Sequence, residues 1–284
     1  MLYTIKSNEL TVSIDSYGAE LKSVKNQNGT EFIWQSNEIW SGSAPILFPI
    51  CGGIIDDEFT YEGKTYHLPK HGFGRKSEFT VETQTENSIT FLLCSNEETL
   101  KVYPFDFELR INFITADNKL NVTYNVKNLT DGKMYFSIGA HEGYATPEGI
   151  EEYDVIFNEN ETLDAVALNG NYLTAEKTRI ITDSKVLSLK HDYFKIDALV
   201  FEKFNSQYCT LAHRGGTRKI KVEFEDFNHL LLWHKPMANY MCVEPWNGLQ
   251  SYEWSEKDIT KKPGIIELEK SKEYCVNHKI TFEI

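Results

Sequence analysis

Residues 107–113 read Phe-Glu-Leu-Arg-Ile-Asn-Phe, and residues 119–126 read Lys-Leu-Asn-Val-Thr-Tyr-Asn-Val. In both stretches apolar and polar side chains alternate, which is typical of a β-strand with one buried and one exposed face. The residues between them, Ala116-Asp117-Asn118, include turn-forming types. This region therefore predicts two β-strands separated by a short turn.

The same alternation recurs on both sides of this region. Further runs with a period of two occupy residues 4–6, 10–14, 79–82, 88–92, 219–224 and 278–284. Only residues 255–260 suggest a short helical turn, so few helices are available to connect parallel strands. We predict an all-β protein of mostly antiparallel strands. Because no linker or repeat divides the chain, we expect residues 1–284 to form one sandwich-type domain.

The composition excludes several classes of partner. The chain has 284 residues, and its 29 Lys+Arg against 42 Asp+Glu give a net charge of −13. This balance argues against a nucleic-acid partner, which requires clustered cations. No apolar run approaches the roughly 18–20 residues of a membrane span, and the opening MLYTIKSNELTV lacks the apolar region of a secretory signal. We expect a cytoplasmic protein with no nucleic-acid or membrane partner, either a monomer or a homodimer.

Five cysteines are scattered along the chain, and none belongs to a CxxC pair: Cys51, Cys94, Cys209, Cys242 and Cys275. This spacing argues against a zinc ribbon and against a disulfide framework. We interpret the cysteines as buried reduced thiols.

Motifs for phosphate loops, dinucleotide sites, zinc proteases and nucleophile elbows are absent. Residues 69–75, Pro-Lys-His-Gly-Phe-Gly-Arg, instead suggest a tight chain that brings the imidazole of His71 and the guanidinium of Arg75 toward one point. The alternative is a surface turn capped by His71. His67 lies four residues before His71, but the residues between look extended, so we do not expect a metal-binding pair.

A second candidate segment is Tyr-Phe-Ser-Ile-Gly-Ala-His-Glu-Gly-Tyr at residues 135–144. His141 follows an apolar run and enters a glycine-bearing loop, which is how a strand presents a side chain at the rim of a cleft. The alternative is a core histidine whose hydrogen bonds are satisfied.

The third segment, residues 240–248, reads Tyr-Met-Cys-Val-Glu-Pro-Trp-Asn-Gly. Glu244 stands in an apolar run, where desolvation disfavours the charged carboxylate and tunes its pKa toward that of a general base. The alternative is a structural buried ion pair. Trp246 offers a flat apolar face of the type that stacks on a sugar ring. Together the three segments suit proton transfer on a neutral polar ligand.

These segments resemble those of a known family, the aldose 1-epimerases or galactose mutarotase-like proteins, and are most similar to its LacX-like branch. The likeness is carried by residues 44–49 (Ala-Pro-Ile-Leu-Phe-Pro), 71–75, 139–141, 197–201 (Asp-Ala-Leu-Val-Phe) and 242–246. These motifs follow the family's order over the full chain. The resemblance implies a β-supersandwich and a cofactor-independent isomerase that interconverts the α and β anomers of a hexose.

The resemblance also implies roles for individual residues. Glu244 matches the general base that takes the proton from the anomeric C1 hydroxyl, and His141 matches the acid that protonates the ring oxygen. His71 matches a histidine that orients the substrate, and Asp197 matches an acceptor for sugar hydroxyls. We therefore expect catalytic residues Glu244 and His141, no metal, no cofactor, and a small-molecule sugar substrate bound by His71, Arg75, Asp197 and Trp246.

One position departs from the family pattern. Family members commonly have Pro-Ile-Val-Gly-Arg where this chain has Pro49-Ile50-Cys51-Gly52-Gly53, so Gly53 replaces an Arg that reaches the substrate. A lost guanidinium removes a charge-assisted contact of about 1.5–3 kcal/mol. Either Arg75 or Arg110 compensates, or the ligand differs, or activity is weak.

Two alternatives to a mutarotase of free hexoses remain. Lys70 and Arg75 flank His71 and are positioned to receive a phosphate, which favours a hexose-6-phosphate mutarotase. The Gly53 departure favours a non-catalytic carbohydrate-binding or regulatory protein on the same fold. A lyase or a glycoside hydrolase on a related supersandwich is a remote further alternative, because hydrolysis normally needs two suitably spaced carboxylates and only one stands out here.

Overall fold

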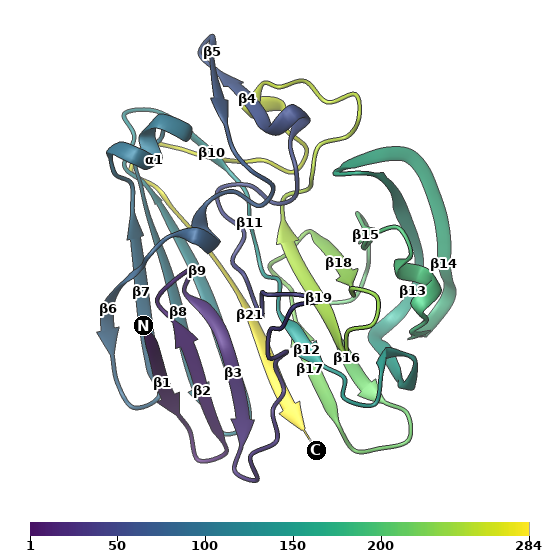
Figure 1. Ribbon diagram of the computed structural model, residues 1–284. Coiled ribbons are helices and arrows are strands. Elements are labelled where there is room, and N and C mark those ends of the chain that lie inside the picture. The colour runs from purple at the N-terminus through teal and green to yellow at the C-terminus, as the bar shows by residue number, and fades with distance from the viewer. Residues whose placement is uncertain (284) are drawn as a thin grey trace.

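The computed structural model describes residues 1–283, and its largest element is a long, bent β-sheet (Figure 1). In chain order its strands are β6 (Thr80–Gln84), β7 (Ser88–Cys94), β8 (Phe107–Ala116), β9 (Lys119–Asn128), β11 (Ile138–Gly139), β12 (Gly143–Ala145), β13 (Tyr153–Asn169), β14 (Tyr172–Ser188), β15 (Leu199–Phe201), β16 (Tyr208–His213), β17 (Lys219–Glu223), β18 (His229–Trp233), β19 (Tyr240–Asn247) and β21 (Glu273–Glu283). They lie in the order β11-β19-β18-β15-β13-β16-β17-β21-β9-β8-β7-β6, and β12 and β14 add to β19 and β13.

Three smaller sheets complete the architecture. Their strands are β1 (Leu2–Lys6), β2 (Leu10–Asp15) and β3 (Glu20–Asn26); β4 (Glu58–Tyr61) and β5 (Lys64–His67); and β10 (Met134–Phe136) with β20 (Ile266–Leu268). The β1–β3 sheet packs on β7 and β8, as Figure 1 shows. Within residues 1–283 every ladder between named strands is antiparallel. The predicted all-β, mostly antiparallel fold is therefore confirmed.

The alternation that predicts the strands also determines the core. Along β8 the side chains of Phe107, Leu109, Ile111 and Phe113 are buried, and the residues between them are less so. The main apolar cluster extends from Ile5 to Phe282. Burying one such side chain fully stabilises the folded state by about 1.5–3 kcal/mol. The alternating apolar residues therefore both mark the strands in the sequence and stabilise the packing of the sheets.

Helices are few and short in the described part of the chain. The structure has one α-helix, α1 (Glu97–Val102), and 3-10 turns at Ile55–Asp57, Gly74–Lys76, Ile150–Glu152, His191–Phe194 and Ile259–Lys261. The predicted turn at residues 255–260 overlaps only the last of these. The sequence reasoning missed α1, whose six residues are too few to show a helical period. Its signal was the cap: the Asn96 side chain accepts hydrogen bonds from the Glu98 and Thr99 amides.

The remaining local predictions have mixed outcomes. The last predicted strand, residues 278–284, lies within β21, except that Ile284 is outside the described residues. Cys51, Cys209 and Cys242 are buried thiols as predicted, but Cys94 and Cys275 are exposed, because both are on the outward face of their strands. In residues 1–283 no helix has the length and hydropathy of a membrane span.

Candidate active site

The floor of the candidate site is the paired strands β18 and β19. All eight residues of β19 are buried. Since successive strand residues point to opposite faces, Cys242, Glu244 and Trp246 share one face of β19. Leu231 of β18 pairs directly with Glu244, and both side chains line a cavity of about 270 Å³. Glu244 is thus placed at the bottom of the cavity by strand pairing.

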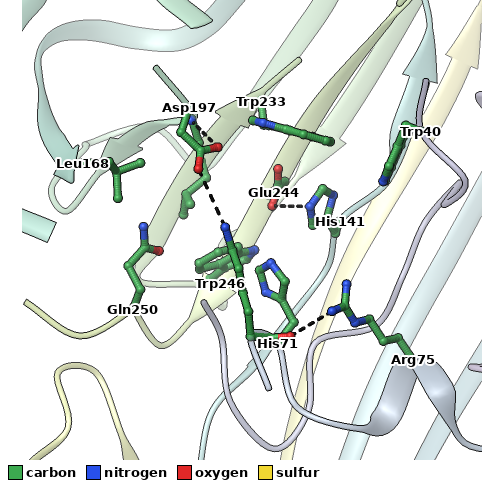
Figure 2. A pocket seen from close by; sticks show the side chains of 13 residues that line it. Trp40, His71, Arg75, His141, Leu168, Asp197, Trp233, Glu244, Trp246 and Gln250 are labelled. Atoms are coloured by element: carbon green, nitrogen blue, oxygen red, sulfur yellow. Dashed lines mark hydrogen bonds and ion pairs between the residues drawn. The ribbon is translucent and has the colours of Figure 1, made fainter. Parts of the chain in front are cut away.

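The cavity brings together all six residues that the sequence analysis selected (Figure 2). The lining residues are Trp40, Lys70, His71, Arg75, His141, Leu168, Asp197, Ala198, Leu231, Trp233, Glu244, Trp246 and Gln250. The sequence analysis did not select Trp40, Trp233 or Gln250. Trp233 ends the apolar run of β18, but Trp40 and Gln250 come from irregular segments that carry no pattern in sequence.

Glu244 and His141 face each other inside the cavity. His141 follows β11 in the loop before β12, as predicted, and its Nε2 lies 3.4 Å from Glu244 Oε2. The imidazole stacks on Trp40 at 5.4 Å between ring centroids and meets Trp233 edge-on at the same distance. The two indoles therefore fix the ring beside the carboxylate.

Burial shifts both groups toward their uncharged forms. Desolvation, followed by the negative charge of Asp197, raises the pKa of Glu244 well above its usual range. Desolvation, reinforced by the positive charges of Lys70 and Arg75, lowers the pKa of His141 to about 3. Near neutral pH we therefore expect the pair to hold one proton, shared between two groups that compete for it.

His71 is a second buried imidazole, held by an unusual backbone. Its φ is +69° and that of Gly72 is +65°, and this tight path turns the ring toward His141 and Trp246, at 5.8 and 5.6 Å between ring centroids. The Gly52 amide donates to His71 Nδ1 at 3.2 Å, which leaves Nε2 to carry the ring proton. Desolvation and nearby cations lower the pKa of His71 well below its usual value. The ring is therefore a neutral hydrogen-bond donor.

Trp246 forms the wall next to His71. Its indole Nε1 donates to the Ala140 carbonyl at 3.1 Å. That hydrogen bond holds the ring edge and leaves a face available to a ligand. Because the bond ties β19 to the residue preceding His141, it also couples the wall to the loop that carries the histidine.

Three charged residues line the cavity above this floor. Asp197 Oδ2 lies 3.7 Å from Lys70 Nζ, and the Arg75 guanidinium donates to the Lys70 carbonyl at 2.9 Å. Arg75 lines the cavity and makes no ion pair with the described residues. Arg110, one of the two residues considered as a replacement for the missing Arg, lies on β8 and pairs with Glu82 and Glu108, because the alternation of that strand turns it outward.

The structure also shows what stands beside Gly53. A Cβ at this position would lie 3.0 Å from Asn171 Cβ and 3.3 Å from the Asn171 carbonyl oxygen. Asn171 is in the turn between β13 and β14, so the tip of that hairpin occupies the space that a side chain at position 53 would enter. The hairpin thus closely approaches the position at which the resemblance implies an Arg.

Comparison with known proteins agrees with this fold. Residues 1–264 match the family model described as aldose 1-epimerase. The chain is 33% identical over 280 residues to the plasmid-encoded LacX protein of Lactococcus lactis subsp. lactis, covering 93% of this chain and 94% of that one. The structure resembles the galactose mutarotase related enzyme of Lactobacillus acidophilus (38% identity, TM-score 0.95, covering 99% and 97% of the two chains). It also resembles a galactose mutarotase-like protein of Lactobacillus casei (26% identity, TM-score 0.94, covering 99% and 100%). The chain belongs to the aldose 1-epimerase family.

Proposed function

We propose that this protein is a mutarotase that interconverts the α and β anomers of a free hexose, with Glu244 and His141 as its proton-transfer pair. The observation that carries the proposal is the 3.4 Å separation of Glu244 Oε2 and His141 Nε2 on the cavity wall. Ring opening moves protons at two oxygens, O1 and O5, that are bonded to the same carbon. The base and the acid must therefore lie side by side.

The reaction follows from a one-proton pair. The Glu244 carboxylate takes the proton of the C1 hydroxyl while the His141 imidazolium gives a proton to O5, and the C1–O5 bond breaks to leave an open aldehyde. Rotation about C1–C2 and the reverse transfers close the ring on the other face. The reactive form, with Glu244 ionised and His141 protonated, holds the same single proton as the resting pair. Substrate binding therefore needs to move only that proton from one group to the other.

The other lining residues suit a neutral polar ring. His71 offers a donor from Nε2, and the Asp197 carboxylate offers an acceptor near the opening. Trp246 presents an indole face, the usual partner for the apolar face of a sugar. We propose that these three side chains, with Arg75, orient the hexose over the Glu244–His141 pair.

Polarimetry on freshly dissolved α-D-glucose and α-D-galactose tests this function. Wild-type protein should accelerate the decay of optical rotation, and Glu244→Gln should lose at least about 100-fold of that acceleration. Glu161→Gln is the matched control, because Glu161 is equally buried but accepts from the Ser206 amide outside the cavity. Acceleration that survives in Glu244→Gln would contradict the catalytic role of Glu244. Absence of acceleration on both sugars and on their 6-phosphates would favour a carbohydrate-binding protein instead.

A hexose-6-phosphate mutarotase is the second candidate, and one observation favours it. Lys70 and Arg75 both line the cavity, and the positive charge of Arg75 is not balanced by a carboxylate of the described residues. An arginine fork suits a phosphate group. A higher kcat/KM on glucose-6-phosphate than on glucose would select this substrate class without changing the roles of Glu244 and His141.

A further inference from the structure

Cys242 is a buried thiol beside the proton-transfer pair, and the proposed reaction does not use it. It lies two residues before Glu244 on the same face of β19. One ligand atom each from His141, Cys242 and Glu244 falls within 4.8 Å of the other two, and all three residues are buried. Figure 2 shows the Glu244 carboxylate directed at the His141 ring, with Trp40 and Trp233 beside that ring. A thiol, an imidazole and a carboxylate therefore lie close together, and two of them, His141 and Glu244, line the cavity.

This donor set is the one that zinc prefers. Zn²⁺ binds thiolate sulfur, imidazole nitrogen and carboxylate oxygen with little geometric demand, and three protein ligands leave its fourth position open. Mg²⁺ and Ca²⁺ select oxygen ligands instead.

Charge balance also requires Cys242 as a ligand. Lys70 and Arg75 line the same cavity and disfavour a bare divalent cation. One thiolate and one carboxylate together neutralise Zn²⁺, whereas Glu244 alone would leave a net positive charge in a buried place. The site needs the sulfur for charge balance as well as for coordination.

A second observation concerns His141. Its Nδ1 is buried, and the described residues give that atom no hydrogen-bond partner. Buried polar atoms are normally paired. No hydrogen bond at Nδ1 therefore has to break for the imidazole to act as a ligand, and Nε2 already lies 3.4 Å from Glu244 Oε2.

We propose that His141, Cys242 and Glu244 form a zinc-binding site, and that Zn²⁺ bound there inhibits the enzyme. Binding releases two protons to solvent, the proton of the Cys242 thiol and the one that the Glu244–His141 pair holds, with no change in oxidation state. Inhibition follows because the ion occupies both groups of the proton-transfer pair. The binding stands on the ligand geometry, and only its effect on turnover rests on the proposed mutarotase function.

Titration of the purified full-length chain with Co²⁺ tests the ligands directly. Thiolate coordination should produce a charge-transfer band that saturates at one equivalent, and Zn²⁺ should displace it. Cys242→Ala should abolish the band and weaken Zn²⁺ binding, measured by calorimetry, by at least about 100-fold. Cys209→Ala, which removes an equally buried thiol elsewhere in the core, should retain both.

Two further measurements protect the test from ambiguity. If Cys242→Ala fails to fold, Glu244→Gln preserves side-chain volume and should also weaken Zn²⁺ binding. Micromolar Zn²⁺ should suppress wild-type and Cys209→Ala mutarotation but not that of Cys242→Ala, and Mg²⁺ should suppress none. Absence of one-to-one Zn²⁺ binding, or binding unaffected by Cys242→Ala, would overturn the site. Binding without any mutarotase activity would uphold the site and reject the proposed function.

Discussion

Gly139 of β11 pairs in register with Trp246 of β19, and a Cβ at position 139 would lie 2.6 Å from the Trp246 Cδ1 atom. The wall of the cavity therefore depends on the absence of a side chain on the neighbouring strand. The same indole donates to the Ala140 carbonyl, one residue before His141. A change at Gly139 should thus reach both the Trp246 ring and the loop that carries His141.

We expect Gly139→Ala to displace the Trp246 ring. Overpacking of this kind costs about 1–3 kcal/mol of unfolding free energy, and the displaced indole should raise KM more than it lowers kcat. Chemical denaturation and polarimetric kinetics would measure the two effects. Gly215→Ala serves as control, because a Cβ there meets its nearest neighbour only at 4.0 Å. Equal behaviour of the two variants would show that this close approach has no role.

The pH dependence of kcat/KM should reflect a pair that holds one proton. Because burial lowers the pKa of His141 to about 3, no acid limb should appear near pH 6.5. Because burial and Asp197 raise the pKa of Glu244, activity should fall on the alkaline side as the pair loses its single proton. Asp197→Asn removes a negative charge, lowers the pKa of Glu244, and should move that limb to lower pH.

Measurement of kcat/KM from pH 4.5 to 9 for wild type and Asp197→Asn distinguishes these outcomes. An acid limb near pH 6.5 would mean that His141 titrates as an exposed imidazole. An alkaline limb that does not move in Asp197→Asn would mean that Glu244 is not the group responsible.

The buried histidines should also make folding stability depend on pH. Desolvation lowers the pKa of His71 well below its usual value, and that of His234 to about 4. Between those values and the unfolded value of about 6.5, the unfolded chain binds more protons than the folded one. Stability should therefore rise with pH across this window and be lost as pH falls through it. Glu244 acts in the opposite direction, since its raised pKa means that the folded state binds the extra proton.

Urea unfolding between pH 4.5 and 7 measures this linkage. The midpoint should fall as the pH is lowered, His234→Gln should flatten the dependence, and Glu244→Gln should steepen it. A midpoint that rises on acidification would contradict the burial of neutral imidazoles.

Arg75 should determine how efficiently the protein acts on an anionic substrate. Its guanidinium lines the cavity without a carboxylate partner among the described residues. We expect Arg75→Gln to lower kcat/KM on glucose-6-phosphate by roughly 10-fold or more, with a smaller loss on glucose. Equal losses on both sugars would show that Arg75 supports the site's structure and does not contact a phosphate.

The fold could be predicted wherever one face of a strand is exposed. β8 and β9 are such strands, and their period of two is visible in sequence. β19 is buried along its whole length, so its residues do not alternate and it could not be predicted as a strand. β13 and β14 pair with several register shifts, which interrupts the pattern along both.

The candidate site could be predicted to a similar degree. Glu244 and His141 are unusual in their apolar or glycine-rich surroundings, and family motifs added Asp197. Trp40 could not be found in this way, because tertiary packing alone brings its irregular segment against His141. Gly53 was recognised as a departure from the family, but its close contact with Asn171 depends on the β13–β14 hairpin, which the sequence pattern did not predict.

The central claim is that Glu244 and His141 act as one proton-transfer unit, and a double-mutant cycle tests it most directly. Mutarotation rates on glucose would be measured for wild type, Glu244→Gln, His141→Asn and the double variant. Each single change should cost about 10²–10⁴-fold, and the double variant should be no slower than the slower single one, because removing either partner already disables the unit. Losses that multiply in the double variant, or a single variant with wild-type activity, would contradict the claim.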